Sequence, residues 1–209
     1  MRILIADDHP VVRRGLKQIL ADEYKTLTVG EAQNAQEALR LIDEQDWDIA
    51  VLDISMPGKS GLEVLKELKQ LRPKLPVLIL TSYPEEQYAI RVLKAGARGY
   101  MTKESAPEHL IAAIRTVTRG GHYISPGLAE LLAITLSNDQ GKPPHEALSD
   151  REYQVLCMLA SGKTVGQIAE ALSLSVKTVS TYRVRLLEKM QMKTNAELIH
   201  YAISNKLVG

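Results

Sequence analysis

The sequence predicts an α/β domain with a doubly wound, five-stranded parallel sheet, followed by a small all-α domain. Strand-like and helix-like segments alternate from residue 1 to about 123, the alternation then stops, and from Leu148 onward only helical spacing remains. Repeated strand–helix–strand units favour a parallel sheet with helices on both faces. With 209 residues, the chain is long enough for both domains.

The predicted strands of the first domain are short apolar runs, near residues 2–6, 26–31, 48–52, 76–80 and 97–101. The predicted helices have apolar residues at spacings of three and four. We expect them near residues 10–20, 34–44, 60–71, 85–95 and 107–118. Gly96 is expected to end the fourth helix in the left-handed conformation, and Ser60 is a candidate cap for the third.

After residue 123 the sequence changes character. Pro126 begins a short connecting helix, and the polar segment 137–147, with its glycine and two prolines, reads as a linker. Four further helices are predicted at 149–160, 164–171, 175–190 and 194–204. The predicted domains are therefore 1–123 and 148–209, joined by a connecting helix and linker at 124–147.

The composition is that of a globular protein, with 45% hydrophobic and 24% charged residues. Because only 4% of the residues are aromatic and none is Phe, the core must be aliphatic. Cys157, the single cysteine, is expected to be a small buried hydrophobe. No apolar run approaches the roughly 18 residues of a membrane span, and the first is too short for a signal peptide. We expect a soluble, cytoplasmic protein with no membrane partner.

Reactive or switchable residues follow four of the predicted strands. Asp7 and Asp8 follow the first strand, Asp53 the third, Thr81 the fourth and Lys103 the fifth. Each alone is explained as a helix cap, a turn residue or a solvated charge. Because strand ends of the same polarity share one edge of a parallel sheet, we expect these side chains to converge on one site.

Three carboxylates at short range repel one another unless a cation compensates them. Mg²⁺ prefers such oxygen ligands, and Lys103 supplies an ammonium group. A carboxylate, here Asp53, can attack phosphorus to give an acyl phosphate, while the metal and the lysine neutralise the transferred oxygens. The Thr81 hydroxyl could then bind the new phosphoryl group, and the ring of Tyr100 could move inward behind it.

The second domain contains a helix-turn-helix pattern, with a short helix at 165–172, a turn at 173–175 and a longer helix at 176–190. One face of the longer helix is expected to be apolar, through Val176, Val179, Leu186, Leu187 and Met190. Segment 175–193 holds five basic residues against one acidic residue, a net charge of +4. A solvated helix face is the plain alternative, but such charge is typical of phosphate binding. The predicted DNA contacts, from a helix in the major groove, are Lys177, Thr178, Ser180, Thr181, Val184, Arg185 and Lys189.

Arg183 falls in the middle of the predicted apolar face. Because a buried guanidinium group needs a partner, we expect it to pair with Glu152, or as a second choice with Glu170. Arg183 and Glu152 are therefore predicted to be structural residues.

The order Asp7-Asp8, Asp53, Thr81, Tyr100, Lys103 resembles the receiver domain of bacterial two-component response regulators. The resemblance implies a flavodoxin-like sheet of order 2-1-3-4-5. It also implies an acidic metal pair, a phosphoacceptor, a switch hydroxyl, a switch aromatic residue and a functional lysine, in that order of residues. The backbone carbonyl of Ser55 is implied as a further metal ligand. Glu104 follows Lys103 where many receivers have a proline after a cis bond, so this loop is expected to be built differently.

The segment Leu148-Ser149-Asp150-Arg151-Glu152 and the stretch from Lys177 to Arg183 resemble the LuxR-type DNA-binding domain. The combination is similar to the NarL/FixJ family, and within it to the GacA/UvrY group. It implies a transcription regulator that a sensor histidine kinase phosphorylates on Asp53 with Mg²⁺. The phosphorylated chain would bind double-stranded promoter DNA as a homodimer. The implied dimer surface is His9, Val12 and Arg13 or the last receiver helix, unless His9 is a loop residue without a role.

Two other function classes are open at this point. Some phosphatases also use an Asp nucleophile, a metal and a lysine on a parallel sheet, but they need a second Asp where this chain has Ser55. We therefore predict that the chain is not an enzyme. A signalling adaptor whose helical domain binds protein is the second alternative, and the +4 segment argues against it.

Overall fold

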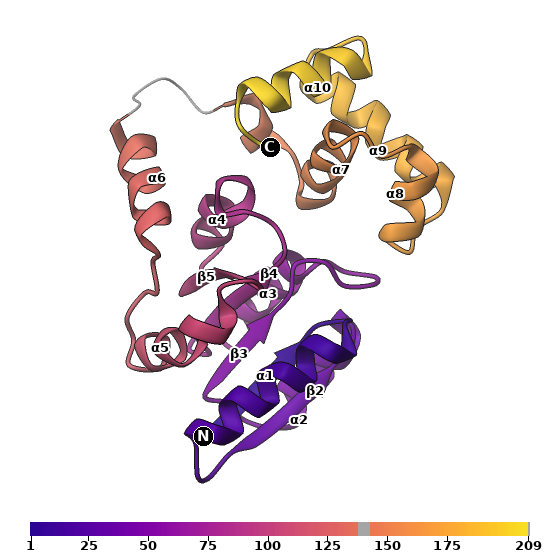
Figure 1. The fold of residues 1–209 in the computed structure, drawn as a ribbon. Helices are drawn as coiled ribbons and strands as arrows, with labels where there is room; N and C mark the ends of the chain where they lie inside the picture. Colours follow the sequence, from indigo (N-terminus) through magenta and orange to yellow (C-terminus); the bar gives the residue numbers. More distant parts are fainter. Residues whose placement is uncertain (138–142, 209) are drawn as a thin grey trace. The chain divides into compact units, whose positions relative to one another are not determined.

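The computed structural model describes residues 1–137 and 143–208 (Figure 1). It divides into two compact units, Met1–Ala133 and Ile134–Gly209. Part of the predicted linker, residues 138–142, lies outside the described residues. Each unit is described by itself below.

The first unit is built on a parallel sheet whose strand order is β2-β1-β3-β4-β5. The predicted α/β class and the strand order are thereby confirmed. The first strand has the expected bounds, and the ends of the others differ from the expected ones by at most two residues. The strands are β1 (Arg2–Ala6), β2 (Thr28–Ala32), β3 (Ile49–Leu52), β4 (Val77–Thr81) and β5 (Gly99–Thr102).

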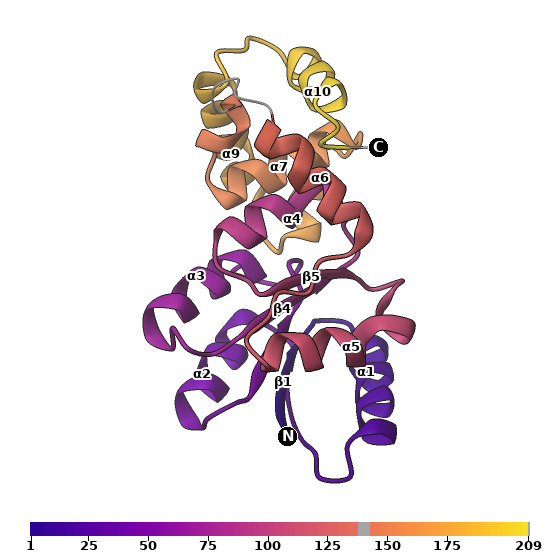
Figure 2. The same ribbon diagram turned by 90° about the vertical axis from the view of Figure 1, so that its left-hand side faces the viewer.

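Five helices connect and follow these strands, and they cover both faces of the sheet. Helices α1 and α5 lie on one face, and α2 and α3 lie on the other (Figure 2). This arrangement leaves the carboxyl ends of the strands free to carry a site. The helices are α1 (Pro10–Glu23), α2 (Ala35–Glu44), α3 (Gly61–Leu71), α4 (Glu85–Lys94) and α5 (Ala106–Thr118).

Local sequence explains where several of these helices begin and end. Ser60 and Glu63 form a reciprocal capping box at the start of α3, which confirms the predicted cap. Gly96, just after α4, has a φ of 100°, the left-handed conformation expected for it. The Ser60 cap also fixes the loop between β3 and α3, which begins at Asp53.

The core of the first unit is aliphatic, as the composition requires. Ile3, Ile5 and Val51 from the strands belong to one buried cluster with Leu110 and Ile114 of α5. Burial of such side chains stabilises the fold by roughly 1.5–3 kcal/mol each. The sheet is therefore a rigid support for residues at its edge.

The second unit is helical, as predicted. Helix α7 contacts α8, α9 and α10, and α8 contacts α9. A 3₁₀ helix, η1 (Pro144–Ala147), lies within the predicted linker. In the described part of the chain, no helix has the length and apolar character needed to cross a membrane. The helices are α6 (Pro126–Ser137), which crosses the unit boundary, α7 (Asp150–Ala160), α8 (Val165–Ala171), α9 (Val176–Lys189) and α10 (Asn195–Ser204).

Candidate functional site

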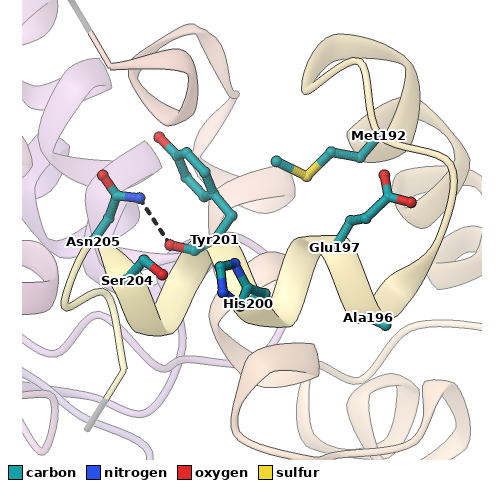
Figure 3. A pocket seen from close by; sticks show the side chains of 7 residues that line it. All are labelled: Met192, Ala196, Glu197, His200, Tyr201, Ser204 and Asn205. Carbon is teal, nitrogen blue, oxygen red and sulfur yellow. Dashed lines mark hydrogen bonds between the residues drawn. The ribbon is translucent and has the colours of Figure 1, made fainter.

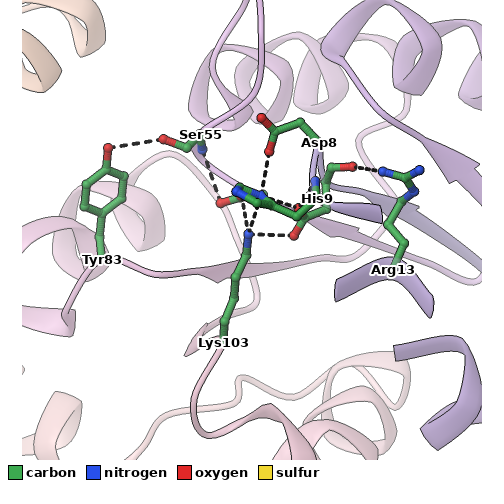
Figure 4. A network of polar contacts seen from close by, with 8 residues as sticks. Asp8, His9, Arg13, Ser55, Tyr83 and Lys103 are labelled. Atoms are coloured by element: carbon green, nitrogen blue, oxygen red, sulfur yellow. Dashed lines mark hydrogen bonds and ion pairs between the residues drawn. The ribbon is translucent and has the colours of Figure 1, made fainter. Parts of the chain in front are cut away.

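The structure brings the three carboxylates together at the carboxyl ends of β1 and β3. Figure 4 shows Asp8 beside His9 and Lys103 at this edge of the sheet. Asp7 and Asp53 are each only 2% exposed, and Asp8 lies at the rim. Ligand atoms of Asp7, Asp8, Asp53 and the neighbouring His9 all lie within 4.8 Å of one another. Buried carboxylates at this range repel one another strongly, so the cluster has the charge and the ligand atoms to hold a cation.

Lys103 reaches into this cluster from the end of β5. Its Nζ lies 2.6 Å from Asp53 Oδ2 and 2.7 Å from Asp7 Oδ2. Its backbone N–H donates to the carbonyl of Thr81, 2.8 Å away, which fixes the loop to β4. Burial by itself would lower the pKa of Lys103, but the charge and hydrogen bonds of Asp53 and Asp7 outweigh burial and raise it. The ammonium group therefore stays charged at neutral pH.

Asp53 is held at its backbone as well as at its side chain. Its N–H donates to the carbonyl of Ala6 (2.8 Å), and the N–H of Ser55 donates to its Oδ1 (3.2 Å). Burial raises the pKa of Asp53, and Lys103 opposes this by attraction and hydrogen bonding. A buried carboxylate with few solvent contacts is a stronger nucleophile than a hydrated one.

Gly61, at the start of α3, was missed by the sequence reasoning. A Cβ atom built on it would lie 1.9 Å from the carbonyl oxygen of Asp53. Only glycine therefore allows α3 to approach the backbone of Asp53 this closely. The signal in the sequence was a glycine directly after the Ser60 cap.

Thr81 and Tyr100, the predicted switch residues, both lie inside the first unit. Thr81 is fully buried, and its Oγ1 has no hydrogen-bond partner within residues 1–137 and 143–208. Tyr100 is also fully buried, and its Oη donates to the carbonyl oxygens of Tyr83 (2.8 Å) and Pro84 (3.3 Å). Burial raises the pKa of Tyr100 well above its usual value. The ring thus lies inside the unit and is tied to the loop between β4 and α4.

The loop that follows Lys103 is a tight turn. The N–H and the hydroxyl of Ser105 both donate to the carbonyl oxygen of Thr102, at 3.2 and 3.0 Å. No peptide bond in the described ranges is cis, so Lys103 and Glu104 are joined by a trans bond.

Helix α9 of the second unit presents the polar face expected for DNA. Lys177, Thr181, Val184 and Arg185 are exposed at helical spacing, while Val179, Leu186 and Met190 on the opposite face are buried. Val176, expected on the apolar face, is 56% exposed. That expectation is wrong because Val176 is the first residue of α9, one turn before the first buried position.

Some hydroxyl groups on α9 and at its start form hydrogen bonds within the helix. The Ser175 hydroxyl accepts from the N–H of Thr178 (3.0 Å) and also bonds the Thr178 hydroxyl (2.8 Å). The Thr181 hydroxyl donates to the carbonyl of Lys177 (3.0 Å). Ser180 lies half-buried between the exposed and buried faces.

The predicted pairing of Arg183 with Glu152 is wrong. Arg183 Nε donates instead to Oδ1 of Asn195, at 2.6 Å, and Glu152 pairs with Lys189, at 2.7 Å. Glu152 lies at the start of α7, where it closes the capping box with Ser149. Lys189 lies about 9 Å further along α9 than Arg183, and it is this residue that reaches Glu152 at the start of α7. Glu152 therefore holds Lys189, which was predicted to contact DNA, and Arg183 stays structural with another partner.

A pocket of about 630 Å³ lies along α10, between Met192 and Asn205 (Figure 3). The Asn205 side chain donates to the carbonyl of Tyr201 (2.8 Å) at one end of it. None of the predicted site residues lines this pocket, so its position does not alter the assignments above.

Two protein families match the chain. Residues 3–115 match the response regulator receiver domain, and residues 146–202 match the bacterial regulatory proteins of the luxR family. The chain is 37% identical to the response regulator GacA of Pseudomonas aeruginosa, over 100% of this chain and 98% of GacA. It is 35% identical to the response regulator UvrY of Escherichia coli K12, over 99% and 95%.

Solved structures of RcsB have a similar fold. RcsB from Salmonella enterica serovar Typhimurium, bound to promoter rprA with the phosphomimetic BeF₃⁻, matches with a TM-score of 0.63 and 27% identity, over 98% of this chain and 99% of that one. A structure of two RcsB dimers bound to two parallel DNAs matches with a TM-score of 0.61 and 27% identity, over 98% of both chains.

Proposed function

We propose, because this chain belongs to the NarL/FixJ family of response regulators, that phosphorylation of Asp53 controls its binding to promoter DNA through α9. The family consists of DNA-binding transcription regulators, and the predicted function class is confirmed at that level. The observation that carries the residue assignment is the contact of Lys103 with both buried carboxylates, Asp7 and Asp53.

In the proposed reaction, an oxygen of Asp53 attacks the phosphorus of a sensor kinase's phosphohistidine or of a small phosphodonor. A phosphorus–oxygen bond forms and the bond to the donor breaks, so the donor leaves with its electron pair. Lys103 neutralises charge on the transferred oxygens. The donor set of Asp7, Asp8, Asp53 and the Ser55 carbonyl fits Mg²⁺, which prefers oxygen ligands. When bound, Mg²⁺ would supply further positive charge to the transferred oxygens.

The switch would begin at Thr81. Its buried hydroxyl has no acceptor among the described residues, so a new phosphoryl oxygen nearby offers it one. The phosphoryl group adds about −1.5 to −2 charge and three acceptors. A movement of Thr81 also moves the loop that carries Tyr83 and Pro84, whose carbonyls hold Tyr100.

A second contact extends this path to the connecting helix. The Ser125 hydroxyl lies 2.7 Å from both carboxylate oxygens of Glu85, the first residue of α4. It also accepts from the N–H of Leu128, 3.0 Å away, and so caps α6. A pocket of about 390 Å³, whose lining includes Tyr100, Glu85 and Ser125, leaves room for movement. We propose that α6 receives the signal through Glu85.

The output is binding of α9 in the major groove by a homodimer. Lys177 and Arg185 are the proposed phosphate contacts, with Ser180, Thr181 and Val184 facing the bases. Two recognition helices related by a twofold axis match two half-sites, and RcsB, which is similar to this chain, was solved as dimers on DNA. Because its DNA target lies in the cytoplasm of a bacterium, we place the protein there.

Mapping the phosphoryl group tests the assignment. The full chain is incubated with acetyl phosphate and Mg²⁺, and the modified residue is located by borohydride reduction and mass spectrometry. We expect labelling of Asp53 alone, its loss in Asp53→Asn, and unchanged labelling in the control Asp46→Asn, which removes an exposed carboxylate. Labelling that persists in Asp53→Asn would contradict the assignment.

The alternatives are separated by two assays. Steady multiple turnover of a phosphomonoester would favour a phosphatase, whereas one phosphoryl group per chain favours the regulator. Absence of any DNA binding at low salt would favour the adaptor. The luxR-family match over residues 146–202 supports DNA as the target.

A further inference from the structure

The edge of the sheet opposite the acidic cluster carries two segments of opposite charge. Residues 43–48, which lead into β3, contain four acidic residues and no basic one, a charge of −4. Residues 69–76, which run from the last turn of α3 into β4, contain three basic residues and no acidic one, a charge of +3. Because β3 and β4 are hydrogen-bonded neighbours, about 4.8 Å apart, the two segments form one charged edge at the amino ends of the strands. The N-terminus lies at the same edge (Figure 2).

The charges of the two segments do not neutralise each other. Arg72 Nη2 donates to the backbone carbonyl of Asp43, 3.4 Å away, rather than to its carboxylate. Within residues 1–137 and 143–208, no ion pair joins one segment to the other. Asp46 and Lys74 are both exposed, and their side chains have no hydrogen-bond or ion-pair partner within those ranges. Charges of both signs therefore face outward.

The ends of the helices do not account for this pattern. The carboxyl end of a helix carries a partial negative charge, which favours basic residues there. Lys69, in the last turn of α3, fits that rule. Helix α2 contradicts it, because it ends in Asp43 and Glu44 and has no basic residue in its last turn. Lys74 lies three residues beyond the end of α3, where the effect of the helix has faded.

An exposed apolar side chain lies where the two segments meet. Leu71, the last residue of α3, is 68% exposed, and the next residue, Arg72, bonds to Asp43. An apolar centre with a charged rim is the usual composition of a protein–protein contact. DNA fits this surface poorly, because residues 43–48 repel phosphate groups.

A matching partner presents basic groups to residues 43–48, acidic groups to residues 69–76 and an apolar group to Leu71. A second copy of the same edge, related by a twofold axis, meets all three requirements, because such an axis brings each segment against its opposite. We propose that the charged edge is a self-association surface, where two copies meet across a twofold axis near Leu71. The contact is weak and transient, because exposed ion pairs contribute little.

This surface is distinct from the phosphoacceptor site, which lies at the carboxyl ends of the strands. Its formation depends neither on phosphorylation nor on DNA. Association through it would join regulator dimers that are bound at neighbouring sites on one promoter. Cooperative binding to tandem sites is the function that such a contact supplies.

Exchanging the charges tests the proposal. Self-association of the full chain is measured by sedimentation equilibrium without DNA, in an Asp53→Asn background that excludes the proposed phosphorylation. The parent chain should self-associate below about 1 mM. One variant carries Asp43→Lys and Asp46→Lys, and the other carries Arg72→Glu and Lys74→Glu. Each alone sets like charges against one another at both contacts, so its dimer should be at least about tenfold weaker.

An equimolar mixture of the two variants restores opposite charges at both contacts. Its mixed dimer should form with an affinity within about threefold of the parent chain. No gain on mixing two folded variants, or a parent chain that stays monomeric up to about 1 mM, would overturn the proposal. Circular dichroism establishes that both variants fold.

Leu71→Ser is an independent test that leaves the charges in place. It should weaken the dimer about tenfold, because it removes the apolar centre from both copies. Leu136→Ser, at a side chain that is 86% exposed outside the charged edge, is the control and should have no effect. Salt at about 1 M, which screens charges beyond about 3 Å, should also weaken the dimer. A dimer that is insensitive to Leu71→Ser or to salt would contradict the proposed surface.

Discussion

At the scale of single residues, the negative charge of the buried Asp53 side chain lowers the stability of the folded chain. Replacing it with the neutral Asn removes this cost. Burial raises its pKa in the folded chain, so the ionised form is less favourable there than in the unfolded chain. This cost is absent well below the unfolded pKa of about 3.9 and grows as the pH rises through the folded pKa.

Without divalent ions, Asp53→Asn should therefore be more stable than wild type at pH 7, and the difference should shrink as the pH falls toward 4. Urea denaturation in EDTA at a series of pH values measures it. Asp46→Asn, at an exposed carboxylate, is the control for the loss of one negative charge. The explanation is refuted if the difference in unfolding free energy between Asp53→Asn and wild type is constant with pH. It is also refuted if Asp53→Asn is the less stable protein at pH 7.

Gly61 has an equally local role. A Cβ atom added to it would lie 1.9 Å from the carbonyl oxygen of Asp53, so Gly61→Ala must displace α3 or the backbone of Asp53. We expect a loss of roughly 1–3 kcal/mol in stability and slower labelling by acetyl phosphate. Gly15→Ala is the matched control, because nothing lies within 4 Å of its added Cβ, and in the helix interior it should stabilise by about 0.5–1 kcal/mol. Labelling at the wild-type rate in Gly61→Ala would be the contrary result.

At the scale of helices and strands, the link between α4 and α6 is open to a direct test. Ser125→Ala removes the hydroxyl that joins Glu85 to the start of α6. Phosphorylation of Asp53 should proceed as in wild type, while the change in DNA affinity on phosphorylation should decrease. Ser125→Thr keeps a hydroxyl and should retain the change. Quantitative gel shifts with and without acetyl phosphate measure both variants, and an undiminished response in Ser125→Ala would exclude this path.

Helix α9 gives a prediction that distinguishes two lysines. Lys177→Ala should weaken DNA binding and reduce the salt slope by about one, the value for one phosphate contact. Lys189 is paired with Glu152, so Lys189→Ala should lower the stability of the second unit and change the salt slope little. Binding isotherms at several salt concentrations, together with thermal unfolding, separate these effects. Equal salt slopes for the two variants would mean that Lys189 contacts phosphate after all.

The elements themselves were largely predictable from the sequence. Apolar runs and helical spacing located β1 to β5 and the helices, because an element with a buried face has apolar residues at regular intervals in its sequence. The convergence of Asp7, Asp53 and Lys103 on one edge also followed, because strands of the same polarity end at one edge of the sheet. Contacts between side chains of different elements did not follow. These contacts depend on how the helices are placed in space, which the spacing of apolar residues does not determine. Examples are the partners of Arg183 and of Ser125, and the short distance between Gly61 and Asp53.

At the scale of the whole molecule, the chain combines a receiver unit and a helical DNA-binding unit, joined through α6 and the following segment. The proposed chemistry occurs in the first unit, and the proposed output occurs in the second. A regulator of this kind requires that one covalent change at Asp53 alters the affinity of α9 for DNA. Family membership makes DNA binding the output, and phosphoryl transfer to Asp53 in the acidic cluster is the proposed input.

The most direct test is the affinity of the full chain for a DNA fragment enriched from a random pool. Affinity is measured with and without acetyl phosphate and Mg²⁺, for wild type and Asp53→Asn. We predict that phosphorylation tightens wild-type binding at least about tenfold, or about 1.4 kcal/mol, and leaves Asp53→Asn unchanged. An equal response in both proteins, or none in wild type that is labelled at Asp53, would contradict the account.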